Sequence, residues 1–149
     1  MKLSGWIGGG IGAVALAALG AWLFVSPEVR IDATDADSVA RGEQLYAKHC
    51  AACHGRNLEG QPDWQSRNAQ GRLPAPPHDE HGHTWHHDDQ VLFEVTKYGL
   101  ARHAPPGYQS DMPAFEGTLV DKDIVDVLAF IKSRWPALII DKRREAGMN

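Results

Sequence analysis

The stretch "YAKHCAACHGRNLEG", residues 46–60, contains both cysteines of the 149-residue chain, Cys50 and Cys53. They are three positions apart, and His54 follows the second cysteine directly. Side chains at i and i+3 lie on the same side of a helical turn, so the two thiols can act on one bound group. Three kinds of site use such a pattern: a dithiol redox pair, part of a zinc site, and the attachment point of a covalent haem.

The residues around the motif disfavour the first two kinds. A thioredoxin-like pair follows a β-strand, whereas "DADSVARGEQLYAKH" favours a helix with Asp37 or Ser38 as its N-cap. A zinc site needs four ligands, and the chain has no second cysteine pair, so two of its histidines would have to complete the site. Covalent haem uses every feature. Cys50 and Cys53 form thioethers with the two vinyl groups, and His54 supplies the proximal nitrogen to the iron of one haem c.

Haem iron in an electron carrier needs a sixth ligand, which is often a methionine thioether. The chain has only Met1, Met112 and Met148, and Met112 alone stands between the haem motif and a later helix, in the turn-rich segment "YQSDMPAFEG". Pro113 biases Met112 toward an extended conformation. We therefore predict His54 and Met112 as the metal ligands. The alternative is a methionine that fills a gap in the core.

Residues 38–135 resemble a class I c-type cytochrome. "GEQLYAKHCAACHG" resembles the N-terminal helix of that family and its haem motif, "DMPAF" the methionine loop, and "LVDKDIVDVLAFIKSRWP" the C-terminal helix. The resemblance implies that the two helices cross closely, with Gly42 and Tyr46 facing Val127, Leu128 and Ile131. It also implies that a proline carbonyl after the motif accepts a hydrogen bond from the proximal histidine. Pro74, Pro76 and Pro77 are the candidates for this role, and we favour Pro76.

The apolar pattern of the other segments indicates further helices. "HDDQVLFEVTKYG", residues 87–99, predicts a helix with Asp88 or Asp89 as its cap and Gly99 as its C-terminal stop. Asp121 is expected to cap the last helix, which Pro136 ends. No segment has a convincing strand pattern. We therefore expect an all-α class I cytochrome c fold around one covalent haem, preceded by one N-terminal transmembrane helix.

The N-terminal segment "GWIGGGIGAVALAALGAWLFV", residues 5–25, carries no charge. At about 1.5 Å per residue it would form a helix of roughly 31 Å, which matches the hydrocarbon core of a bilayer. Lys2 precedes it and acidic residues follow it, which favours a haem domain on the outer side. A cleaved signal peptide, with "ALG" at 18–20 as a weak cleavage site, is the alternative. The predicted parts are an anchor (1–25), a flexible acidic linker (26–37), a haem domain (38–136) and a C-terminal tail (137–149).

Residues 61–87, "QPDWQSRNAQGRLPAPPHDEHGHTWHH", form a long connection rich in proline and histidine. The indole N–H of Trp85 either hydrogen-bonds a haem propionate or belongs to a side chain that simply packs. Five imidazoles lie close together in the sequence, which is a composition that binds copper or zinc in some proteins and is merely solvated in others. These are His78, His81, His83, His86 and His87.

The chain has a net charge of −4, which gives no electrostatic basis for binding nucleic acid. With His54 and Met112 both on the iron, no position stays open for oxygen or peroxide, so we predict an electron-transfer protein and not an enzyme. It would act on the periplasmic side of a bacterial cytoplasmic membrane. It would carry electrons between complexes such as quinol–cytochrome c oxidoreductase and a terminal oxidase or photosynthetic reaction centre. The alternatives are an electron-entry haem subunit of an oxidase or dehydrogenase, and a metal-handling protein that uses the histidine-rich connection.

Overall fold

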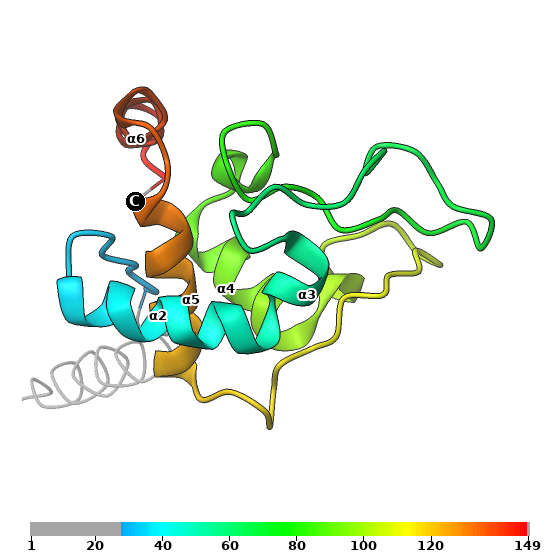
Figure 1. Ribbon diagram of the computed structural model, residues 1–149, viewed down its shortest axis with the longest axis horizontal. Helices are drawn as coiled ribbons and strands as arrows, with labels where there is room; N and C mark the ends of the chain where they lie inside the picture. Colours follow the sequence, from blue (N-terminus) through cyan, green and yellow to red (C-terminus); the bar gives the residue numbers. More distant parts are fainter. Residues whose placement is uncertain (1–27, 149) are drawn as a thin grey trace, which may run out of the picture.

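The computed structural model describes residues 28–148, which form α-helices and two 3-10 turns without any β-strand (Figure 1). The expectation of an all-α domain is thus confirmed for this part of the chain. Its elements are α2 (Ala36–His49), α3 (Ala51–His54), η1 (Thr84–His86), α4 (Asp89–Tyr98), η2 (Leu100–Arg102), α5 (Asp121–Ser133) and α6 (Ala137–Glu145). None of these helices is long and apolar enough to cross a membrane, and the predicted anchor lies outside the described residues.

Helices α2 and α5 cross at a very short distance, as the resemblance implied. A Cβ added to Gly42 would lie 1.9 Å from the main-chain oxygen of Asp126, so no larger residue fits at this crossing. The ring of Tyr46 packs 5.3 Å from the ring of Phe130, centroid to centroid. On α5, Asp126 and Phe130, four residues apart, therefore contact α2 directly. The three residues expected to face α2, at positions 127, 128 and 131, are buried.

A buried carboxylate fastens this crossing. Asp126, whose side chain is 1% exposed, accepts hydrogen bonds from Arg41 Nε at 2.9 Å, from Lys122 Nζ at 2.9 Å and from the hydroxyl of Ser38. Burial alone raises the pKa of Asp126, but the hydrogen bonds from Arg41, Ser38 and Lys122 outweigh it and lower this pKa to about 2. The carboxylate is therefore ionised throughout the neutral range and ties α2 to α5.

The helix boundaries agree with the sequence at α4 and differ from it at α2 and α5. Asp88 caps α4 by accepting from the N–H of Val91 at 2.8 Å, and Gly99 ends it with a φ of 80°. The cap of α2 is Asp35, which accepts from the N–H groups of residues 37 and 38, so the prediction of Asp37 or Ser38 is wrong by two or three positions. The cap position of α5 is Val120, and Asp121 is its first helical residue.

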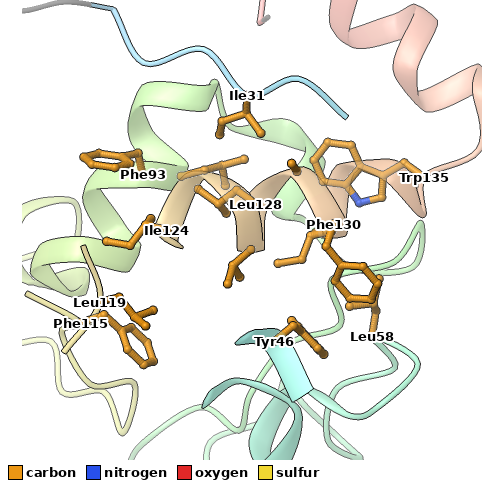
Figure 2. Packing of buried hydrophobic residues seen from close by; sticks show 14 of the residues in the cluster. Ile31, Tyr46, Leu58, Phe93, Phe115, Leu119, Ile124, Leu128, Phe130 and Trp135 are labelled. Atoms are coloured by element: carbon orange, nitrogen blue, oxygen red, sulfur yellow. The ribbon is translucent and has the colours of Figure 1, made fainter. Parts of the chain in front are cut away.

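The core is a cluster of apolar side chains on the inner faces of α2, α4 and α5, extended by Leu58, Phe115, Leu119 and Trp135 from the connecting segments (Figure 2). Tyr46, Leu58 and Phe130 gather at one end of this cluster, next to the segment that follows α3. The core thus holds the haem motif against α5.

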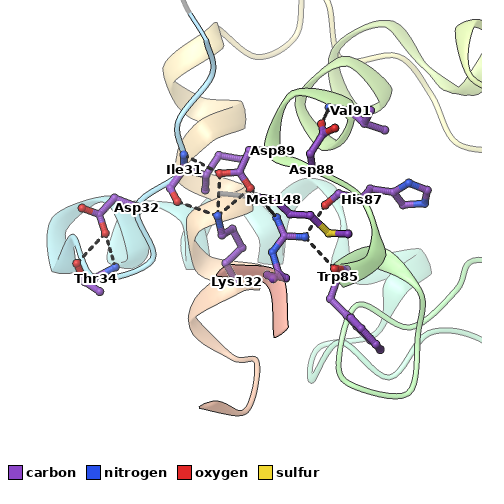
Figure 3. A network of polar contacts seen from close by, with 11 residues as sticks. Ile31, Asp32, Thr34, Trp85, His87, Asp88, Asp89, Val91, Lys132 and Met148 are labelled. Carbon is purple, nitrogen blue, oxygen red and sulfur yellow. Dashed lines mark hydrogen bonds and ion pairs between the residues drawn. The ribbon is translucent and has the colours of Figure 1, made fainter. Parts of the chain in front are cut away.

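A second buried carboxylate joins segments that are far apart in the sequence (Figure 3). Asp89, at the start of α4, accepts from the N–H of Ile31 at 3.0 Å, from Lys132 Nζ at 2.8 Å and from Arg143 at 2.9 Å. Lys132 also donates to the carbonyl oxygen of Ile31. We call these four residues the Asp89 cluster.

The Asp89 cluster corrects two of the expected boundaries. The described part of the predicted linker, residues 28–37, is not free, because Ile31 is only 4% exposed and packs in the core, and helix α2 already begins at Ala36. The predicted tail contains helix α6, whose Arg143 is 1% exposed and donates to the carbonyl oxygens of Trp85, His87 and Met148. Both ends of the described chain are therefore part of the folded domain.

Candidate functional site

The two cysteines and the histidine lie on one helical turn where α2 passes into α3. Cys50 is the C-cap of α2, and its N–H donates to the carbonyl oxygen of Tyr46 at 2.9 Å. Its own carbonyl oxygen accepts from Cys53 and His54, at 3.1 and 3.0 Å. Gly55, with a φ of 80°, ends the turn. Cys50 is half-buried and Cys53 is exposed.

This geometry disfavours the dithiol and zinc interpretations of the motif. Burial, followed by the charge of Cys53, raises the pKa of Cys50 to about 11, whereas a catalytic dithiol needs a lowered thiol pKa. The pair also follows a helix and not a strand. Within residues 28–148, the metal-ligating side chains that converge in a group of three are Asp79, Glu80 and His81, and none of them is a cysteine.

His54 is held in the orientation that a metal ligand requires. Its Nδ1 lies 2.8 Å from the carbonyl oxygen of Pro76, and the residue is 8% exposed. A carbonyl oxygen can only accept, so Nδ1 carries the proton and Nε2 presents its lone pair. Burial lowers the pKa of His54, partly opposed by the Pro76 carbonyl, so the ring is neutral at pH 7. The hydrogen bond expected between these two residues is present.

The segment that carries Pro76 is fastened to the residues after the haem motif. Gln61 N–H donates to the carbonyl of Ala75 at 2.9 Å, and the N–H of residue 78 donates to the carbonyl of Leu58 at 2.8 Å. Gly60, with a φ of +70°, packs against the Pro76–Pro77 bond, where an added Cβ would lie 2.5 Å from the nitrogen of Pro77. Hydrogen bonds before and after Pro76 in the sequence thus fix the position of its carbonyl group.

Met112 lies in the loop between η2 and α5, partly buried against the core. Its N–H donates to the hydroxyl of Ser110 at 3.0 Å. Two contacts join this loop to the 61–87 connection: an ion pair between Arg72 and Asp111, and the guanidinium of Arg67 at 5.7 Å from the ring centre of Tyr108. The methionine loop and the connection therefore pack against each other.

Two buried N–H donors of the connection have no acceptor within residues 28–148: Nε1 of Trp85 and Nε of Arg72. Trp85 stacks on His86 at 3.6 Å, so its ring is held in place. Buried N–H groups normally have partners, and carboxylates such as the two propionates of a haem would supply them. The donor set thus fits a haem. Arg72 was not predicted, because nothing in the sequence distinguishes it from the other arginines of the chain.

The five histidines of the connection do not converge on a common point. His83 stacks on Trp64 at 5.5 Å, His86 stacks on Trp85, and His81 is exposed. His83 and His87 approach each other, edge to face, at 5.7 Å. Within residues 28–148 the five imidazoles are thus not gathered in one group, and His81 lies instead with the carboxylates of Asp79 and Glu80.

The comparisons with known proteins agree with the site. A family model described as Cytochrome c matches residues 39–135, which is more than half of the chain. The matched region contains the Cys50–His54 turn, the segment of Pro76 and the loop of Met112. Neither the curated proteins nor the solved structures contain a match to this chain.

Proposed function

Because the chain belongs to the cytochrome c family and binds one covalently attached haem c through Cys50 and Cys53, we propose that it carries single electrons between membrane-bound redox complexes. When bound, the haem supplies a one-electron couple. The observation that carries the proposal is the turn on which both cysteines and His54 lie, with His54 oriented by Pro76 at 2.8 Å.

In this proposal His54 and Met112 would hold the iron of the haem. The hydrogen bond to Pro76 fixes the imidazole plane of His54 and raises the basicity of Nε2. A methionine thioether favours the reduced state and raises the reduction potential. With both positions filled by the protein, small molecules do not reach the metal, which favours electron transfer over catalysis.

Trp85 and Arg72 hold the propionates in this proposal. Each presents a buried N–H group that the described residues leave unpaired, and a carboxylate is the acceptor that both donors suit. The ion pair between Arg72 and Asp111 then connects the propionate region to the loop of Met112.

The state of the iron tests this assignment. The ferric protein is expected to show the charge-transfer absorption band of sulfur–iron ligation, and the ferrous protein is expected not to bind carbon monoxide. Replacing Met112 with alanine should remove the band, open the iron to carbon monoxide and lower the potential, while the haem stays attached to Cys50 and Cys53. Carbon monoxide binding by the unmodified ferrous protein would overturn the carrier function.

We further propose that residues 5–25 anchor the domain in a bacterial cytoplasmic membrane, with the haem on the outer side and the quinol-oxidising and terminal complexes as partners. The apolar run and the preceding Lys2 support this. Because Ile31 is packed in the core, only six peptide steps separate residue 25 from the domain, a reach of up to about 20 Å. The domain would therefore stay close to the membrane surface.

The anchor is tested with the full chain and a chain that begins at residue 28. The shorter chain should keep its spectrum and potential, leave the membrane fraction, and reduce the oxidase in membranes more slowly at equal total concentration. Equal rates for the two chains would show that the anchor does not bring the domain to its partners.

A further inference from the structure

One histidine of the connection lies directly against the proximal histidine. The ring of His78 stacks on the ring of His54, with the centroids 3.9 Å apart and the planes 20° from parallel. Nδ1 of His78 is 2.7 Å from the hydroxyl of Thr84, which is itself 6% exposed. The hydrogen bond between His78 and Thr84, the first residue of η1, thus holds the two imidazoles face to face.

The main chain of His78 is fixed as firmly as its ring. Its N–H donates to the carbonyl oxygen of Leu58, and its carbonyl oxygen accepts from the indole of Trp135, both at 2.8 Å. Trp135 is 5% exposed and lies two residues after the end of α5. Nearby, Gly82 allows the chain to pass so close to Pro77 that an added Cβ would lie 1.9 Å from its carbonyl oxygen. Contacts with several separate segments thus fix the position of His78.

His78 is not a competing ligand in this geometry. A nitrogen lone pair lies in the plane of its ring, so two nearly parallel rings 3.9 Å apart direct their lone pairs along separate, parallel lines. A metal bound about 2 Å from Nε2 of His54 is therefore out of line for His78. The ring of His78 therefore contacts His54 and does not bind the metal.

We propose that His78 is a positioning residue, whose ring holds the imidazole of His54 in the plane that points Nδ1 at the Pro76 carbonyl. The Pro76 bond fixes one atom of the His54 ring, and the ring can still rock about that bond. The flat face of His78 stops this motion, because rocking would drive the His54 ring into it. The stack thereby fixes the orientation of the proximal ligand plane and keeps the Pro76 bond short. This inference rests on the ligation by His54 proposed above.

The test uses the full-length haem protein with His78→Leu, Thr84→Val and a matched control, His83→Leu. His83 belongs to the same connection and also stacks on an aromatic ring, that of Trp64, but it is exposed. Haem content is measured first. The proton shifts of the four haem methyl groups in the ferric protein then report the orientation of the axial ligand planes, and a redox titration gives the potential.

His78→Leu is expected to keep its haem, to change the order or spread of the methyl shifts, and to raise the potential, because a looser Pro76 bond makes His54 a weaker donor. Thr84→Val should shift the methyl signals less, and His83→Leu should leave them unchanged. A methyl pattern and potential identical to those of the unmodified protein in His78→Leu would overturn the inference. If His78→Leu loads no haem, Thr84→Val decides in the same way. A missing charge-transfer band in the unmodified protein would instead contradict Met112 as an iron ligand. The role of His78 would still be decided by the methyl shifts.

Discussion

Replacing Asp126 with asparagine should remove a large part of the free energy that holds α2 on α5. The pKa of Asp126 falls from 3.8 to about 2, and each pKa unit corresponds to about 1.4 kcal/mol, so the carboxylate contributes about 2 kcal/mol to folding at pH 7. Its side chain is 1% exposed, so solvent screens this contribution little. A loss of this size lowers the melting temperature of a domain of about 100 residues by roughly 8–16 °C.

The pH dependence gives a sharper test, because the sign follows from the lowered pKa. The contribution of Asp126 is fully present above about pH 4 and is lost as the pH falls toward 2. Urea unfolding followed by circular dichroism, at fixed ionic strength between pH 2 and 7, should show a smaller loss of stability in Asp126→Asn over this window.

The control is Asp141→Asn, because Asp141 forms an ion pair with Arg144 at 2.8 Å while its side chain is 60% exposed. Such a surface pair contributes only about 0–1 kcal/mol. Equal stability of Asp126→Asn and the unmodified protein at pH 7, or an unchanged pH profile, would refute the role assigned to this carboxylate.

Three further outcomes are expected. Gly42→Ala should destabilise the domain by about 2 kcal/mol in urea unfolding, because overpacking against main-chain atoms outweighs the gain in helix propensity. The control Ala40→Gly, at an exposed site of the same helix, measures the helix-propensity difference alone. Trp85→Phe should lower the reduction potential in a redox titration, since a propionate would lose a hydrogen-bond donor; an unchanged potential means that the indole only packs. Lys132→Met should cost about 3 kcal/mol of unfolding free energy, because the buried carboxylate of Asp89 loses a partner, and a neutral effect would show that Arg143 suffices.

The sequence predicted those parts of the structure that depend on local chemistry. The Cys50–His54 motif identified the haem attachment, because the reaction itself dictates the spacing of its residues. Asp88 and Gly99 marked the ends of α4, because a cap and a left-handed stop act within one turn. A proline carbonyl as the partner of His54 followed from the family resemblance, but the structure was needed to select Pro76 among Pro74, Pro76 and Pro77.

The parts that were missed depend on contacts between distant residues. Ile31 lies in a polar, acidic segment without helical periodicity, and its burial depends on Lys132, which is 101 residues away. Arg143 has the sequence surroundings of an exposed helix, but it is buried against the carboxylate of Asp89, three carbonyl oxygens and the ring of Trp135. The stack of His78 on His54 likewise has no local signal, because it requires the connection to fold back over the haem motif.

The Asp89 cluster is expected to form late in folding, because its contacts join residues that are far apart in the sequence. The last member to leave the ribosome is Arg143, and the contact between Ile31 and Lys132 closes most of the domain into one loop. Pulsed hydrogen exchange during refolding is therefore expected to protect the amides of α2 before the N–H of Ile31, and the reverse order would contradict this sequence of events.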